Sequence, residues 1–369
     1  MMMMCEISGS STLLQYCHSG RNLYNGMRGT GVLRTTACQF VKRAVGNMKA
    51  VVITQPGGPE VLQLQDVEEP KLAENEVMIK ITATALNRAD CFQRSGRYPR
   101  DSLYLGFECS GVIEALGESV QKWKVGDQVC ALLVGGGYAE KVNVPEGQIM
   151  PVPKGVSLLE AAALPETTCT VWSTVFMTSK LTAGESFLVH GGSSGIGTFA
   201  IQMAKAKGCK VFCTVGNQEK ADFCKKLGAD VAINYKEQDF VEVIKQETDG
   251  KGVNIILDHI GVSYFQKNLD ALSIDGRLFM ISFMSGSVGQ INLIPIFQKR
   301  LTVQGATLRH RTIQKKAEIV AEVIKNVWPE VEAGRVKPVV HCTLPMAEAG
   351  KAHELMESSS HCGKILLFN

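Results

Sequence analysis

The stretch FLVHGGSSGIGTFAIQ, Phe187–Gln202, decides the fold. Its first residues, Phe187–His190, form a short apolar run typical of a buried strand, and a helical run is predicted to begin near Thr198. Between the two lies a glycine-rich turn. The segment GIGTFA at 195–200 fits the G-x-G-x-x-G/A pattern that binds dinucleotides, in the strand–turn–helix context that the pattern requires.

Each residue type in this turn has a predicted task. Gly195 is expected to allow the tight turn, Gly197 to let the backbone approach a pyrophosphate, and Ala200 to keep the helix close to the strand. The helix N-terminus then offers unpaired N–H groups to the phosphates. The hydroxyl of Ser194 could reach a phosphate or the hydride acceptor. The predicted cofactor-binding residues of the turn are Gly192, Ser194, Gly195, Ile196 and Gly197.

The end of the second predicted strand, Cys209–Val215, favours NADPH over NADH. NADH sites usually place Asp or Glu there to bind the ribose 2′-hydroxyl, whereas this chain has Gly216 and Asn217. Lys220 on the following helix could meet a 2′-phosphate, and Tyr235 after the third strand could cover the same end of the cofactor. The alternative is that Lys220 is a solvated helix lysine.

Composition and charge indicate a soluble enzyme of two or three domains. The 369 residues are 45% hydrophobic and 20% charged, with a net charge of +3 and no basic stripe that would favour nucleic acid. No apolar run approaches the roughly 20 residues that span a membrane. Twelve Cys without a paired framework favour a reducing compartment. The pairs His341-Cys342 and His361-Cys362 lack zinc-ligand spacing, so no metal is expected.

Residues 1–47 differ from the rest of the chain. They hold several basic residues against a single acid, Glu6, with Ser and Thr interspersed, which is typical of a mitochondrial or plastid transit segment. The alternative is sequence upstream of a second start at Met48, which would leave the protein cytoplasmic. Either way the segment is predicted to be disordered and to take no part in the chemistry.

The remaining sequence predicts two domains. Residues 48–167 are rich in strands and turns, and 311–369 add a helix and a final strand, Lys364–Phe368. Between them, residues 168–310 repeat strand–helix units, with strands at Cys209–Val215, Asp230–Asn234, Gly252–Asp258 and Arg277–Ile281. The fold class is therefore predicted as α/β, with a doubly wound parallel Rossmann sheet inserted into a β-rich domain.

Several spaced motifs resemble one known family. They are ALNRAD at 85–90, GFECSG at 106–111, GD at 126–127, GGYAE at 136–140, NY at 234–235, LDHIG at 257–261 and GKI at 363–365, together with the glycine turn. Their order from Met48 to Asn369 resembles the zinc-free quinone oxidoreductase branch of the medium-chain dehydrogenase/reductase superfamily. Within that branch the chain is similar to the type that a tumour suppressor induces in animals, which has plant counterparts. The resemblance implies a GroES-like catalytic domain beside the Rossmann domain, and a homodimer.

The resemblance also identifies two positions where zinc-dependent relatives have metal ligands. They place a Cys where this chain has Asn87, and the His of a Gly-His-Glu motif where it has Phe107. Asn and Phe do not serve as zinc ligands in this role, so zinc catalysis is not expected. Without a Lewis acid, the remaining chemistry is hydride delivery to an acceptor that is already electron-poor, and a quinone fits.

Three residues are predicted to contact the substrate. Asn87 is expected to face the cleft and to donate an amide N–H to a quinone oxygen, or else to form a turn with its own backbone. Gln93 and Tyr98 lie on the segment that borders the substrate in the family, and Tyr98 could equally pack in the core. Phe283 and Met284 begin a Gly- and Ser-rich loop, 283–289, that resembles the family's loop over the nicotinamide and could equally be a surface turn.

The sequence therefore predicts an NADPH-dependent quinone oxidoreductase that transfers hydride without zinc. One alternative is an NADPH-dependent alkenal or enone double-bond reductase, which shares the fold and the cofactor. Another, from a different class, is a non-catalytic RNA-binding role, which the charge pattern disfavours. The physiological acceptor stays open, as does transfer of one or two electrons.

Overall fold

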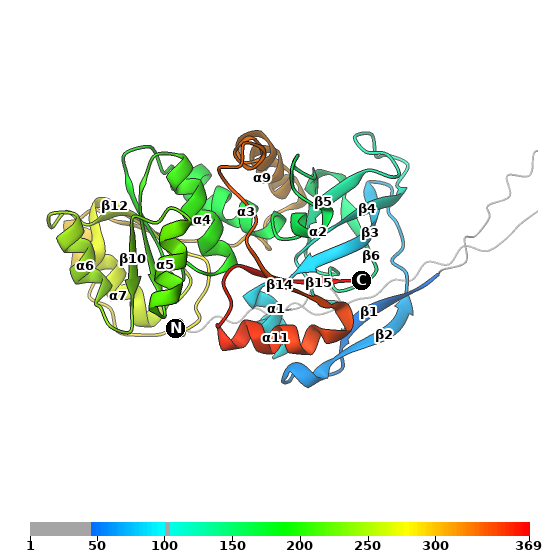
Figure 1. Ribbon diagram of the computed structural model, residues 1–369, viewed down its shortest axis with the longest axis horizontal. Helices are drawn as coiled ribbons and strands as arrows, with labels where there is room; N and C mark the ends of the chain where they lie inside the picture. Colours follow the sequence, from blue (N-terminus) through cyan, green and yellow to red (C-terminus); the bar gives the residue numbers. More distant parts are fainter. Residues whose placement is uncertain (1–45, 100–103) are drawn as a thin grey trace, which may run out of the picture. The chain divides into compact units, whose positions relative to one another are not determined.

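The structure, a computed structural model, describes residues 46–99 and 104–369 (Figure 1). The extension predicted for residues 1–47 lies outside the described residues except for its last two. Two large sheets organise the described chain: a parallel sheet of six strands and a mainly antiparallel sheet of seven. Among the described residues, no helix combines the length and the apolar character needed to cross a membrane.

The parallel sheet has the strand order of a Rossmann fold. Its strands lie in the order β10-β9-β8-β11-β12-β13, which is 3-2-1-4-5-6 in sequence, and every neighbouring pair is parallel. The order reverses between β8 and β11, and ligands bind at such a switch point. The bounds are β8 Ser186–Val189, β9 Lys210–Val215, β10 Val231–Asn234, β11 Val253–Asp258, β12 Leu272–Met280 and β13 Thr302–Gly305.

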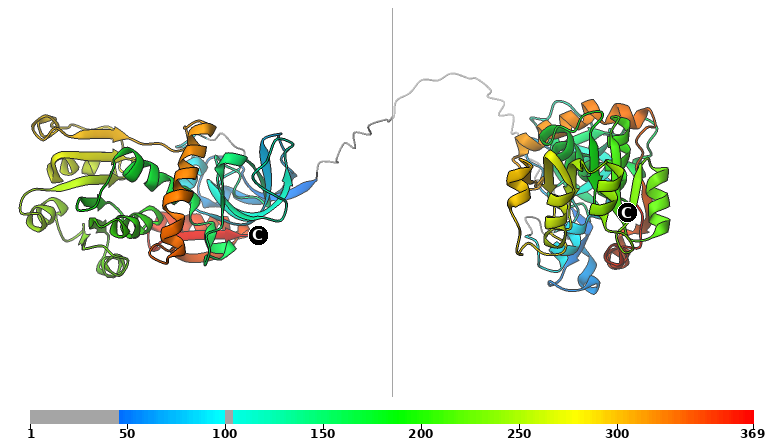
Figure 2. Two further views of the ribbon diagram at one scale, coloured as in Figure 1. Left: turned by 90° about the horizontal axis from the view of Figure 1, so that it is seen from above. Right: turned by 90° about the vertical axis from the view of Figure 1, so that its left-hand side faces the viewer.

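Helices cover both faces of this sheet because its strands are apolar on both sides. Phe187 and Val189 pack into the same core as helices α4 (Gly195–Ala206) and α5 (Gln218–Lys226). Leu188, which points to the opposite face, packs with α6 (Phe240–Glu247) and α7 (Val262–Ala271). Figure 2 shows the helices on either side of the strands. The predicted α/β fold class with a doubly wound parallel sheet is confirmed.

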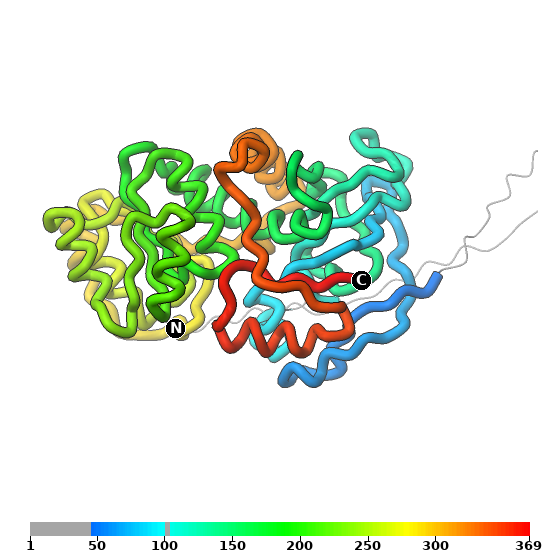
Figure 3. Tube along the Cα trace, in the orientation of Figure 1, coloured from blue at the N-terminus to red at the C-terminus, as the bar shows by residue number. Residues whose placement is uncertain are grey.

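The second sheet joins strands from residues 76–151 to strands near the C-terminus. Its order is β14-β15-β3-β4-β5-β7, with β6 also paired to β3. Figure 3 shows the C-terminal segment returning beside the early strands, where β15 pairs antiparallel with β3. The bounds are β3 Glu76–Ala85, β4 Glu108–Leu116, β5 Gln128–Leu132, β6 Lys141–Pro145, β7 Ile149–Pro151, β14 Val340–Pro345 and β15 Lys364–Phe368, and a separate hairpin pairs β1 Asn47–Ile53 with β2 Leu62–Glu68.

A further set of helices packs around the two sheets. Helix α3 (Pro165–Val171) contacts both α4 and β5, and α9 (Ile313–Asn326) contacts α3 and β7. The indole of Trp328 donates to the Pro151 carbonyl at 2.7 Å. The remaining bounds are α1 Arg88–Arg94, α2 Leu158–Ala161, a π-helical turn Trp172–Thr178, α8 Ile294–Gln298, α10 Trp328–Glu332 and α11 Ala349–Ser358, with 3-10 turns at Pro59–Val61, Glu146–Gln148 and Met346–Glu348.

Two features differ from the sequence prediction. Helix α4 begins at Gly195 rather than near Thr198, because the Ser194 hydroxyl accepts the Gly197 N–H at 3.0 Å and caps the helix there. Strands β13 and β14 were not predicted; both have half-polar sequences at sheet edges. The predicted domain limits, 48–167 with 311–369 and 168–310, stay predictions.

Candidate functional site

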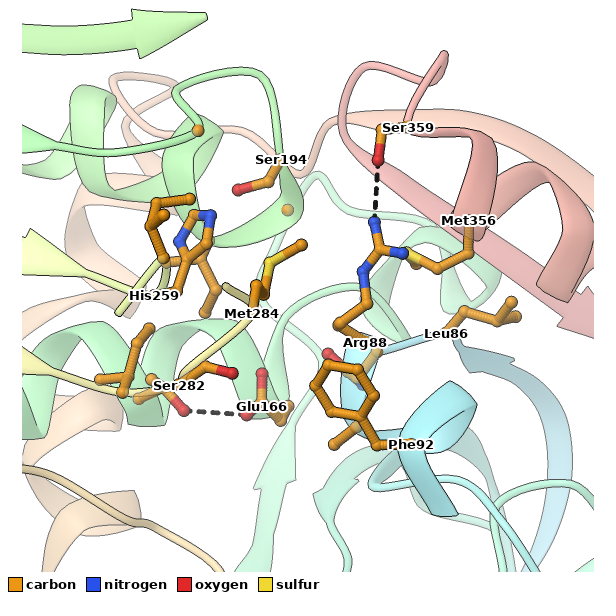
Figure 4. A pocket seen from close by; sticks show the side chains of 18 of the residues that line it. Leu86, Arg88, Phe92, Glu166, Ser194, His259, Ser282, Met284, Met356 and Ser359 are labelled. Atoms are coloured by element: carbon orange, nitrogen blue, oxygen red, sulfur yellow. Dashed lines mark hydrogen bonds between the residues drawn. The ribbon is translucent and has the colours of Figure 1, made fainter. Parts of the chain in front are cut away.

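One large cavity opens between the two sheets, with a volume of about 1370 Å³. Its wall combines the carboxyl edge of the parallel sheet with β3–α1 and the loop before β15 (Figure 4). Seven Lys and Arg side chains line it, against a single carboxylate among the described wall residues, that of Glu166. The cations are Arg88, Arg97, Lys220, Lys236, Arg309, Lys316 and Lys364. Lys364 is paired with Glu108, outside the wall, whereas Lys220 and Lys236 follow β9 and β10 at the carboxyl edge of the parallel sheet, where positive charge suits an anionic ligand.

The turn between β8 and α4 presents the start of a helix to this cavity. Gly191, with φ +63°, makes the tight turn, and Ser194 caps the twelve-residue helix that begins at Gly195. Gly191, Ser194, Gly195 and Ile196 all line the cavity. The backbone N–H groups and the positive end of the helix dipole therefore face the space where a pyrophosphate would bind.

The structure corrects the predicted roles of the glycines. Gly191, not Gly195, makes the left-handed turn, and neither Gly192 nor Gly197 is a wall residue. A Cβ on Gly197 would lie 2.3 Å from the Gly191 carbonyl oxygen, so this glycine lets the helix approach the turn rather than admitting a pyrophosphate. Gly192 lies against Cys213 in the same way, because a Cβ there would be 2.7 Å from the sulfur.

A buried hydrogen-bond network supports the turn from behind. The Nε2–H of His190 donates to the Asn268 side-chain oxygen at 2.7 Å, and its Nδ1 accepts from the Thr214 hydroxyl at 3.0 Å. The Thr214 oxygen in turn accepts the Gly191 N–H at 3.3 Å. Burial lowers the pKa of His190 to about 3, which keeps the imidazole neutral and this donor pattern fixed.

The four residues predicted to choose the cofactor all lie in the cavity wall. Asn217 caps α5, since its side-chain oxygen accepts the Lys220 N–H at 2.9 Å. The Lys220 ammonium donates to the Ser359 and His361 carbonyls, at 2.6 and 2.9 Å. It is therefore tied to the segment before β15, and the alternative of a solvated helix lysine is wrong. The Tyr235 hydroxyl stands over Gly216, 3.0 Å from where a Cβ would be.

Asn87, one of the two positions where zinc-dependent relatives have a ligand, belongs to a lysine-centred network, and the other position is occupied by Phe107. The Lys364 ammonium lies 2.6 Å from Oε1 of Glu108, 2.8 Å from Oδ1 of Asn87 and 2.9 Å from the Leu86 carbonyl oxygen. The second carboxylate oxygen of Glu108 accepts the Glu166 backbone N–H at 2.9 Å. An ammonium among these oxygens does not suit a metal cation, so the residues present do not fit a zinc site.

This network changes the expected role of Asn87. Its amide nitrogen donates to Glu108 Oε1 at 3.0 Å and to the Ala85 carbonyl at 3.3 Å. Both N–H groups are therefore used inside the protein, and donation to a quinone oxygen is not available in this arrangement. Asn87 lines the cavity and begins α1, where its backbone N–H donates to Asp90. The structure thus makes it a residue that holds the cavity wall in place.

The other predicted substrate residues differ in whether they line the cavity. Gln93 is buried and its amide donates to the Pro99 carbonyl at 2.8 Å, so it supports the loop and is not a wall residue. Tyr98 does line the cavity, with the Arg309 guanidinium 4.8 Å from its ring centre. Phe283 and Met284 also line it, and both are partly exposed.

Sequence reasoning missed Lys364 and Glu166. Lys364 belonged to a quoted motif without an assigned role, and Glu166 carried no signal at all. Their importance comes from contacts between distant segments: Lys364 meets Leu86 across 278 residues, and Glu166 meets Glu108 across 58. Arg88 was likewise not predicted. Its guanidinium donates to the Ser359 hydroxyl at 3.0 Å, and Figure 4 marks this hydrogen bond.

Comparison with known proteins identifies the family. Residues 195–325 match the zinc-binding dehydrogenase family, and residues 73–154 match the alcohol dehydrogenase GroES-like domain. The quinone oxidoreductase of Rattus norvegicus is 33% identical over 329 residues, which cover 87% of this chain and 97% of the relative. The chain therefore belongs to the medium-chain dehydrogenase/reductase superfamily. Within it, the chain belongs to the quinone oxidoreductase branch, as its motifs predicted.

Solved structures agree with this assignment. The Escherichia coli quinone oxidoreductase complexed with NADPH has a TM-score of 0.78 and 31% identity, covering 88% of this chain and 99% of that one. An NAD-dependent alcohol dehydrogenase has a TM-score of 0.79 and 32% identity, covering 87% and 100%. The fold is thus shared by proteins that differ in cofactor. The fold alone therefore does not determine which cofactor binds.

A first prediction tests the close approach at Gly197. Gly197→Ala should lower the free energy of unfolding by about 1–3 kcal/mol, because its Cβ meets backbone atoms that cannot move aside. The shifted helix N-terminus should also weaken dinucleotide binding. Gly305→Ala is the matched control for stability, since a Cβ there has no neighbour within 4 Å. Equal denaturant midpoints for the two variants would refute the packing role.

A second prediction concerns the lysine-centred network. Lys364→Met leaves the fully buried Glu108 without its cation and should cost about 3–5 kcal/mol in unfolding free energy. The double variant Lys364→Met/Glu108→Gln should recover part of this loss, because it removes the orphaned charge. Lys351→Met breaks an exposed pair with Glu348 and should cost less than about 1 kcal/mol. Equal losses of unfolding free energy in Lys364→Met and Lys351→Met, measured by urea unfolding, would contradict the stabilising role of the network.

Proposed function

We propose that this chain is an NADPH-dependent quinone reductase that works without zinc. The observation that carries the proposal lies at the carboxyl edge of the parallel sheet, where the N-terminus of α4 and Lys220 line the cavity and no carboxylate ends β9. NADPH carries a pyrophosphate and a 2′-phosphate, and both need positive partners. The E. coli relative complexed with NADPH supports this choice.

Different parts of the wall would hold different parts of the cofactor. The start of α4 would bind the pyrophosphate through the backbone N–H groups of Gly195 and Ile196, both of which line the cavity. Lys220 and Tyr235 would hold the 2′-phosphate, with the phosphate taking the place of the Ser359 and His361 carbonyls on the Lys220 ammonium. The absence of a carboxylate at the end of β9 removes the usual partner of a free ribose 2′-hydroxyl.

The remaining wall suits a planar, electron-poor acceptor. Aromatic and apolar side chains also line the cavity, namely Phe92, Tyr98, Phe107, Phe283 and Met284. When bound, NADPH supplies the hydride. The protein contributes orientation of the two rings and exclusion of water. The network of Lys364, Glu108 and Asn87 provides no Lewis acid to activate an alcohol, which favours acceptors that need none.

An assay of NADPH oxidation tests the function. We expect turnover with ortho- or para-quinones, much slower turnover with alkenals and enones, and no oxidation of simple alcohols by NADP⁺. Faster turnover with an alkenal than with any quinone would instead support a double-bond reductase. Absence of turnover with every acceptor, in protein shown to bind NADPH, would refute the enzymatic proposal.

The homodimer implied by the family resemblance stays a proposal. Strand β13 lies at the edge of the parallel sheet, where unpaired backbone groups can meet another chain. Large apolar side chains are exposed next to it in sequence, including Val288 at 90% and Phe297 at 86%. A second copy covering this edge would remove them from water.

A third prediction tests cofactor choice by charge. Asn217→Asp adds a carboxylate and keeps the α5 cap, because Asp caps as well as Asn. Lys220→Ala removes the cation. Each variant should weaken NADPH binding about 10-fold, or 1.4 kcal/mol, and change NADH binding less than about 2-fold. Lys226→Ala, an exposed lysine on the same helix outside the cavity wall, is the matched control.

Fluorescence titration of both cofactors measures these effects. The Asn217→Asp/Lys220→Ala double variant should move furthest toward NADH. Equal losses for NADPH and NADH would show general damage to the site. Unchanged NADPH affinity in Lys220→Ala would contradict the 2′-phosphate assignment.

A further inference from the structure

Glu166 is the one carboxylate among the described wall residues, in a cavity lined by seven cations. It lies in the first turn of α3. Figure 4 shows its side chain in the cavity, near the side chains of Ser282, Met284 and Phe92. A carboxylate would oppose binding of a polyanion, so its presence in this wall calls for a chemical reason.

Hydrogen bonding distinguishes the two oxygens of this carboxyl group. Oε1 accepts the Thr170 hydroxyl proton at 2.9 Å, from the next turn of α3. Oε2 has no hydrogen-bond partner among the described residues. A proton on Oε2 would therefore be available to a molecule in the cavity, while Thr170 holds the group in one orientation.

The position of Thr170 places this group at the nicotinamide half of the site. Thr170 lines a small side cavity together with Ile281, Ala306 and Thr307, which directly follow β12 and β13. Lys220 and Tyr235 lie at the other half, after β9 and β10. Since a dinucleotide lies across the switch point with its two nucleotides on opposite halves, a 2′-phosphate at Lys220 leaves the nicotinamide beside Thr170.

The surroundings raise the pKa of the Glu166 carboxyl group. Burial raises the pKa of Glu166, and the carboxylate of Glu108 raises it further, whereas the Lys364 ammonium and the Thr170 hydroxyl act in the opposite direction. A carboxyl group with a raised pKa beside a reaction site is suited to general acid catalysis.

We propose that Glu166 is the general acid that protonates the reduced acceptor. The proposal rests on the quinone reductase function above. Hydride transfer to a quinone places two electrons on the acceptor and leaves negative charge on an oxygen. The O–H bond of Glu166 then breaks, a new O–H bond forms on that oxygen, and the neutral hydroquinone leaves. The Glu166 carboxylate regains its proton from solvent before the next turnover.

The test compares quinones whose hydroquinones differ in acidity. In Glu166→Gln, kcat should fall about 100-fold for a quinone that gives a weakly acidic hydroquinone, because its anion must be protonated. It should fall less than about 3-fold for an electron-poor halogenated quinone, whose anion is stable. Glu118→Gln, an exposed glutamate remote from the cavity, is the matched control and should behave as wild type with both.

Two further readouts separate catalysis from structure. With the weakly acidic product, wild-type kcat should fall as pH rises through the Glu166 pKa, because the acid form is lost, and Glu166→Gln should show no such step. In protein without cofactor or substrate, the infrared band of a protonated carboxylic acid should appear as a negative band in the Glu166→Gln minus wild-type difference spectrum below the Glu166 pKa, and it should disappear as the pH rises through that pKa. NADPH affinity should stay the same or improve, since a carboxyl group is removed from a cationic cavity.

Each outcome decides the question. Equal loss with both quinones, or an unchanged pH profile, would refute the acid role while leaving the quinone reductase function intact. Wild-type protein that binds NADPH and reduces no quinone would refute the function and this inference together. A selective loss with the weakly acidic hydroquinone, together with the missing pH step, would establish Glu166 as the acid.

Discussion

The lysine-centred network is the interaction on which the site depends. Lys364 begins β15, Glu108 begins β4 and Asn87 begins α1, and their contacts at 2.6 and 2.8 Å bring three distant segments together. The same segment reaches the parallel sheet, because the Gly363 N–H donates to the Ser193 carbonyl at 2.7 Å in the phosphate turn. The network therefore fixes the turn between β8 and α4 against the opposite wall of the cavity.

This arrangement divides the cavity by chemistry. Under the proposed function, the N-terminus of α4 and Lys220 would hold the phosphates at one half, and the wall around Thr170 and Glu166 would face the reacting rings at the other. A buried ion pair of Lys and Glu is costly to assemble, and its attraction offsets that cost only when the remaining hydrogen bonds are made. Here the Leu86 carbonyl, the Asn87 amide and the Glu166 N–H make them.

The sequence predicted those features of the fold and the site that local sequence patterns encode. The glycine turn, the alternation of strand and helix, and the non-ligand residues at Asn87 and Phe107 led to the fold class, the family and the cofactor turn. Helix α4 was placed three residues late because the cap by Ser194 was not recognised. Roles that depend on contact between distant segments were not predictable: Gly197 packs on Gly191, Gln93 supports a loop, and the Asn87 amide is used by Glu108. Lys364 and Glu166 acquire their roles only through such contacts.

A crystal structure of the NADPH complex tests the central claim most directly. We predict the pyrophosphate on the N–H groups of Gly195 and Ile196 at the start of α4, the 2′-phosphate within hydrogen-bond distance of Lys220 and Tyr235, and the nicotinamide ring beside Thr170 and Glu166. The Lys220 ammonium should exchange at least one of its two carbonyl partners for phosphate oxygens. A 2′-phosphate bound away from Lys220, or a nicotinamide ring that does not reach Glu166, would contradict the account.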